Sequence, residues 1–175
     1  MPSPWNVSVD VTLNTVNPVS FTIDSKDLPK GSNGDLVFKN DGKPGFHISF
    51  NFTDATGLGY RFPPNKKKDE AIWSQVGSNA CPQSPSSDVF HVIGVDEPAR
   101  MTLTVNNPNP SPAQGKFGYT LRVTNDEGNS YLPLDPGGDN MNGSSRQFSA
   151  LAIFAVVATV AIVAIGLYEL GVFGR

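Results

Sequence analysis

Alternating apolar and polar residues predict a series of short strands along most of the chain. Residues 5–13 (WNVSVDVTL) carry an apolar side chain at every odd position and a polar one at every even position. Residues 46–53 (FHISFNFT) repeat this alternation with phenylalanine and isoleucine. A period of two is typical of a half-buried strand. On this basis we expect strands at residues 5–13, 19–24, 35–40, 46–53, 71–76, 89–95, 100–106 and 117–124.

The spacing of these runs predicts the fold class. They are short, they are separated by turn residues such as Asn33-Gly34 and Asp41-Gly42, and none shows a helical period. Such a pattern is typical of a mainly β protein, and we expect an Ig-like antiparallel β-sandwich over residues 1–131. A jelly roll or a small barrel is the alternative way to close the sheet. The 11 phenylalanines supply a core, and the single cysteine excludes the disulfide of antibody domains.

The end of the chain has a different pattern. Residues 147–168 (QFSALAIFAVVATVAIVAIGLY) form an uncharged run of 22 residues. As a helix this run spans roughly 33 Å, enough to cross a hydrocarbon layer about 30 Å thick. We therefore expect a single transmembrane helix at residues 147–168. The Gly/Asn/Ser-rich residues 132–146 are predicted to be a flexible tether, and residues 169–175 a short C-terminal tail.

The start of the chain guides the expected orientation in the membrane. Residues 1–16 have no basic region followed by an apolar stretch, so they do not look like a signal peptide. A chain whose head is synthesised first and whose apolar segment lies near the C-terminal end is typical of a tail-anchored protein. We expect the head on the cytoplasmic side of a bacterial inner or intracytoplasmic membrane and the C-terminus on the opposite side.

Small residues recur in the predicted membrane helix. An alanine stands at every third position from Ala152 to Ala164, and Ala155 with Thr159 forms a small-xxx-small step. Small side chains let helices approach closely in lipid, so the expected partners are other transmembrane subunits as well as the bilayer itself. The alternative is that alanine is plain filler. The candidate helix-packing residues are Ala152, Ala155, Ala158, Thr159, Ala161, Ala164 and Gly166.

A long segment interrupts the strand rhythm between residues 54 and 88. Segments of this length without regular structure are uncommon and are often functional. Within it, Lys66, Lys67 and Lys68 form a basic run beside Asp69 and Glu70. These lysines are candidates for surface contact with anionic lipid headgroups or an acidic partner, and a solvated loop is the alternative.

Composition and motifs argue against an enzyme. The formal net charge is −3, which does not favour nucleic-acid binding. The chain has no nucleophile elbow, no phosphate-binding glycine loop and no HExxH zinc motif. We expect no catalytic residues, no cofactor, no metal and no small-molecule substrate.

Copper is the sharpest chemical alternative. The order His47, Cys81, His91, Met101 is that of a blue-copper site. The spacing differs, because such sites take Cys, the second His and Met from one short loop. Here nine residues separate Cys81 from His91, and nine more separate His91 from Met101. A cupredoxin-like copper carrier is therefore the least favoured hypothesis.

Two dipeptides carry a family resemblance. Glu97-Pro98 stands in GVDEPARMTLTVNN, and Asp135-Pro136 ends FGYTLRVTNDEGNSYLPLDP. Over these stretches the chain resembles the DP-EP family of small bacterial proteins. The resemblance implies a bacterial β-sandwich without assigned activity or catalytic residues, and it does not extend to the predicted membrane helix.

These observations favour a structural role. We expect a non-catalytic, tail-anchored accessory subunit that stabilises a larger membrane complex. A bioenergetic assembly, such as a photosynthetic reaction centre–antenna or respiratory complex, would suit it by analogy. The alternative is a membrane-tethered β-sandwich module that binds a protein or a small ligand.

Overall fold

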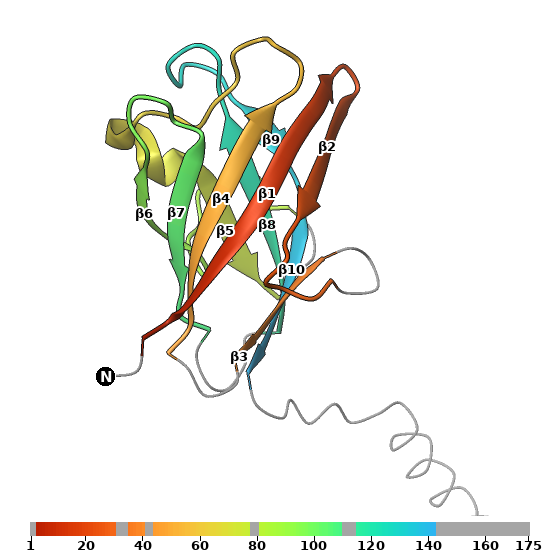
Figure 1. Cartoon of the computed structure of the whole chain (residues 1–175), viewed down its shortest axis with the longest axis vertical. Coiled ribbons are helices and arrows are strands. Elements are labelled where there is room, and N and C mark those ends of the chain that lie inside the picture. Colours follow the sequence, from red (N-terminus) through yellow and green to blue (C-terminus); the bar gives the residue numbers. More distant parts are fainter. Residues whose placement is uncertain (1–2, 31–34, 41–43, 78–80, 110–114, 143–175) are drawn as a thin grey trace, which may run out of the picture. The chain divides into compact units, whose positions relative to one another are not determined.

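Two β-sheets make up the described part of the chain (Figure 1). The computed structural model describes residues 3–30, 35–40, 44–77, 81–109 and 115–142. Sheet A has the strand order β2-β1-β4-β7-β6, and sheet B has the order β3-β10-β8-β5, with β9 also paired to β8. The bounds are β1 Trp5–Val16, β2 Val19–Asp24, β3 Leu36–Asn40, β4 Phe46–Asp54, η1 Asn65–Glu70, β5 Ile72–Val76, β6 His91–Val95, β7 Thr102–Asn107, β8 Gly115–Val123, β9 Leu132–Leu134 and β10 Gly137–Asn142.

The predicted alternation sets the inner faces of these strands. In β1 the side chains of Val7, Val9, Val11 and Leu13 are all buried, while their neighbours face outward. β4 buries its three phenylalanines and its isoleucine in the same way. Because successive side chains of a strand point to opposite faces, this burial confirms the predicted strands at both places.

Aromatic rings fill the space between the sheets. Phe38 of β3 meets Phe46 of β4 at a centroid distance of 5.4 Å, and Phe50 of β4 meets Tyr119 of β8 at 6.1 Å. Phe90 contacts rings from both sheets, including Phe50 at 5.9 Å and Phe117 at 5.4 Å. A mainly β fold with two sheets packed around one core is therefore confirmed.

The expectation of a wholly antiparallel sandwich needs a correction. β1 pairs with β4 in parallel, from Trp5↔Phe46 to Leu13↔Asp54, and β10 pairs with β3 in parallel. The chain leaves sheet A after β2, contributes β3 to sheet B and then returns as β4. A crossover through the other sheet lets β4 run in the same direction as β1. Alternation shows which face of a strand is buried, but it carries no information on the neighbour or its direction.

Part of the predicted tether is strand. β9 and β10 lie within residues 132–146, and both pair with β8. β10 (GGDNMN) lacks apolar alternation, and its place is set by backbone pairing with β8 on one side and β3 on the other. The predicted boundary of the head at residue 131 is therefore too early, because sheet B continues to Asn142.

Among the residues that the structure describes, no helix is long and apolar enough to span a membrane. The predicted transmembrane helix at residues 147–168 and the tail at 169–175 lie outside the described residues.

Candidate functional site

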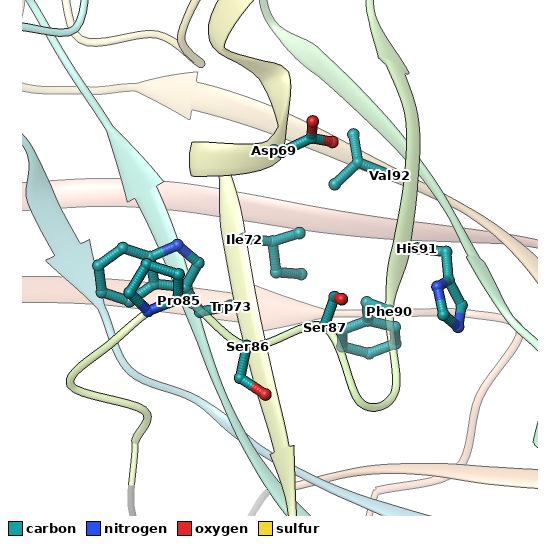
Figure 2. Close-up of a pocket in the computed structure, with 9 residues that line it drawn as sticks. All are labelled: Asp69, Ile72, Trp73, Pro85, Ser86, Ser87, Phe90, His91 and Val92. Atoms are coloured by element: carbon teal, nitrogen blue, oxygen red, sulfur yellow. The ribbon is translucent and has the colours of Figure 1, made fainter.

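A pocket of about 390 Å³ lies where edge strand β5 of sheet B approaches edge strand β6 of sheet A (Figure 2). Its floor is apolar, with Ile72 and Phe90 almost fully buried. Its rim is polar, and η1 contributes Asp69 to it. The lining residues are Asp69, Ile72, Trp73, Pro85, Ser86, Ser87, Phe90, His91 and Val92.

The buried hydroxyl of Ser74 holds residues 86–90, the segment that forms the lower wall of the pocket. The Oγ of Ser74 in β5 accepts hydrogen bonds from the backbone N–H groups of Val89 (3.1 Å) and Phe90 (2.9 Å). The backbone N–H of Ser74 donates to the Ser86 carbonyl at 2.8 Å. These bonds attach the segment to the edge of sheet B, so Ser86, Ser87 and Phe90 are fixed relative to β5.

η1 forms the upper wall and is bound to the edge of β6. The Asn65 side chain accepts from the Val95 N–H at 2.9 Å and donates to the Val95 carbonyl at 2.7 Å. The Lys68 ammonium donates to the Ile93 carbonyl at 2.9 Å. Polar groups of an edge strand would otherwise be open to another chain, and here η1 covers them. The same bonds place Asp69 at the pocket rim.

A cation–π stack supports the third wall. The Arg122 guanidinium lies 3.8 Å from the ring centre of Trp73 and 4.0 Å from that of Tyr131. Its Nη1 also donates to the Glu70 carbonyl at 3.3 Å. Partial burial of the guanidinium lowers the pKa of Arg122 from its usual value. The stack fixes the indole of Trp73 at the side of the pocket.

The rim offers groups that both donate and accept hydrogen bonds. Asp69, Ser87 and His91 are exposed, and Ser86 is half-buried. Within the described residues, no side chain or backbone group is hydrogen bonded to these four side chains. The lining therefore combines a carboxylate, an imidazole and two hydroxyls with the apolar side chains of Ile72 and Phe90, which is the usual composition of a small-ligand site.

The three lysines of the predicted surface patch differ in structure. Lys66 is exposed. The ammonium of Lys67 donates to the Gly128 carbonyl at 2.6 Å, and that of Lys68 to the Ile93 carbonyl. Two of the three ammonium groups thus bind the protein's own backbone, which leaves Lys66 as the most accessible of the run.

The four residues of the copper hypothesis are not brought together. His47 and His91 each lie opposite Asn106, on the outer face of sheet A. Cys81 lies beside Thr120 and Asp135 instead, and its burial, with the Asp135 charge, raises the pKa of the thiol to about 11. Among the described residues, no three His, Cys, Asp or Glu side chains form a group that could hold a metal ion.

An ion-pair cluster that the sequence did not reveal lies among the connecting loops. Arg100 is buried, with a left-handed φ of 58°, and donates to both carboxylate oxygens of Glu127, at 2.9 and 2.7 Å. Arg61 donates to the same carboxylate at 2.6 Å. The two guanidinium groups hold the pKa of Glu127 below its usual value. This cluster joins three loops that are distant in sequence, so its role is structural.

The pocket residues were only partly foreseen. The unusual length of the segment 54–88 did point to this region, and it contributes six of the nine lining residues, Asp69, Ile72, Trp73, Pro85, Ser86 and Ser87. No local motif marks them, because they meet only when β5 and β6 come together. The helix-packing candidates, from Ala152 to Gly166, lie outside the described residues.

No family model matches the chain, and no curated protein matches its sequence.

Proposed function

We propose that this chain is a membrane-tethered β-sandwich binding module, without catalytic activity of its own. The pocket between β5 and β6 carries this proposal. It is supported on three sides by hydrogen bonds or stacking, and its polar rim groups have no partners among the described residues. A site that is pre-formed in this way loses little conformational freedom when a ligand binds.

The tether to the membrane is the second part of the proposal, and it rests on the uncharged run at residues 147–168. A charge at the centre of a membrane helix is strongly unfavourable. We expect the full chain to remain with membranes after alkaline extraction, and Ala158→Arg with Ala161→Arg to release it. Ala158→Leu with Ala161→Leu is the matched control and should stay membrane-bound. Release of the wild-type chain by alkaline buffer alone would contradict the tether.

A non-catalytic accessory subunit of a larger membrane complex is the second candidate function. The repeated small residues of 147–168 favour it, since they suit close packing against partner helices. In this case the helix, rather than the pocket, would hold the partner. A bioenergetic complex is one assembly of this kind. The DP-EP resemblance at Glu97-Pro98 and Asp135-Pro136 is compatible with either function, because it implies no activity.

Two variants of the full chain separate these functions. Ser87→Trp fills the pocket, and Ala155→Phe with Thr159→Phe blocks close approach to the helix. Both are purified from native membranes in mild detergent and compared with the wild type. A binding module loses its bound component only with Ser87→Trp. An accessory subunit loses it only with the helix variant, and that outcome would overturn the leading proposal.

A further inference from the structure

We propose that the pocket between β5 and β6 binds a neutral sugar ring. This inference rests on the proposed function as a binding module and names the chemical class of its ligand. A sugar ring has apolar C–H faces and an edge of hydroxyl groups that both donate and accept hydrogen bonds. The pocket offers both kinds of surface, since Ile72 and Phe90 are apolar and almost fully buried, while Asp69, Ser86, Ser87 and His91 are polar (Figure 2).

The rim groups match hydroxyls better than they match an ionic ligand. Asp69 accepts hydrogen bonds only, whereas Ser86, Ser87 and His91 both donate and accept. A carboxylate that receives hydrogen bonds from hydroxyls makes the stronger, charge-assisted type of bond. No arginine or lysine lines the pocket in the described part of the chain, so the only charged group among the lining residues, Asp69, would repel an anionic ligand.

The surroundings also oppose a cationic ligand. The Lys68 ammonium lies next to the pocket, because it donates to the Ile93 carbonyl at 2.9 Å and to the carbonyl of the lining residue Val92 at 3.5 Å. Its charge offsets that of Asp69, the next residue in η1. A cationic ligand would therefore meet a like charge beside the carboxylate, which favours an uncharged ligand.

The volume of the pocket and the aromatic side chain at its side are consistent with a sugar ligand. A volume of about 390 Å³ lies near the lower end of the range of small-molecule sites, about 300–1,000 Å³. It suits a mono- or disaccharide rather than an extended glycan. Trp73 stands at one side, held by Arg122 at 3.8 Å, and gives an aromatic surface next to the apolar floor. Aromatic side chains are well suited to contact the C–H groups of a sugar.

Fluorescence of Trp73 provides the test. The full chain is purified with Trp5→Phe, so that Trp73 is the remaining tryptophan, in a polyoxyethylene detergent without sugar headgroups. It is titrated with glucose, galactose, N-acetylglucosamine and maltose up to tens of millimolar. Phenethylammonium is titrated in parallel as a cationic probe. We expect a saturable change with at least one saccharide and none with the ammonium compound.

Matched variants locate the binding. Asp69→Ala removes the carboxylate at the rim and should weaken saccharide binding by about tenfold or more. Ser87→Ala should weaken it less, and Asp10→Ala, on the outer face of β1, should leave it unchanged. The proposal is overturned by a flat titration with every saccharide, by a response to phenethylammonium alone, or by equal affinity in Asp69→Ala. None of these results bears on whether Ser87→Trp releases a bound component. The proposal of a sugar ligand can therefore be wrong while the proposal of a binding module holds.

Discussion

Single side chains in this protein connect the core to the pocket. Phe90 is 1% exposed and packs edge-on against Phe38, Phe50, Phe117 and Tyr119, at centroid distances of 5.2 to 5.9 Å. The same ring forms part of the pocket floor. Its backbone N–H is held by the Ser74 hydroxyl. Burial of one phenylalanine thus fixes both the contact between the sheets and the bottom of the candidate site.

Truncation of this ring should strongly destabilise the fold. We expect Phe90→Ala to lower the free energy of unfolding by about 3–5 kcal/mol, because it removes buried apolar area and leaves a cavity between the sheets. Phe90→Leu keeps most of the volume and should cost less than half as much. Urea unfolding followed by circular dichroism measures both. Equal and small losses in the two variants would show that Phe90 is not central to the core.

At the scale of secondary structure, the edges of the sheets explain the position of the pocket. The outer edge of β5 is covered by backbone bonds with the segment around Ser86 and Asp88. The outer edge of β6 is covered by η1 through Asn65 and Lys68. Neither of these two covering segments is a regular strand, so a hollow remains between the edges of β5 and β6. The pocket is therefore a consequence of how two sheet edges are protected.

Loss of the Asn65 side chain should expose the outer edge of β6. Asn65→Ala removes both hydrogen bonds to Val95 and leaves the N–H and carbonyl of that residue without their partner. We expect a loss of about 1–3 kcal/mol in the free energy of unfolding. Hydrogen exchange at the Val95 amide should become faster. Lys66→Ala, on the same 3₁₀ helix but exposed, is the control and should stay within about 0.5 kcal/mol of the wild type.

At the scale of the whole head, carboxylates tie the connecting loops together. Glu127 joins Arg61 and Arg100, as described above. Its neighbour Asp126 accepts hydrogen bonds from the hydroxyls of Ser130 and Thr124, both at 2.6 Å, and from backbone N–H groups. These bonds, led by that of Ser130, place the pKa of Asp126 well below its usual value. These contacts are therefore stronger when both carboxyl groups are ionised.

Stability of the head should therefore fall in acid. A carboxyl whose pKa is lowered by folding stabilises the fold fully above its unfolded value, about 4, and this contribution is lost as the pH falls toward the folded-state pKa. We expect the thermal midpoint to drop between about pH 5 and pH 2. Asp126→Asn should flatten this dependence, because the group no longer titrates. An identical pH profile in the variant would contradict the assignment.

The sequence by itself determined the positions of most strands, their buried faces and the uncharged run at 147–168. These are local properties, since alternation over a few residues is enough to show which side of a strand is apolar. The alternation in residues 5–13 and 46–53 predicted β1 and β4 in this way.

Only the tertiary structure decided how these strands pair and where the pocket lies. The parallel pairing of β1 with β4 and the strand β10, which has no apolar alternation, depend on backbone partners far away in the sequence. The pocket likewise joins Asp69 of η1 and Trp73 of β5 to His91 of β6. Such sites arise from contacts between distant segments, and no short stretch of sequence contains them.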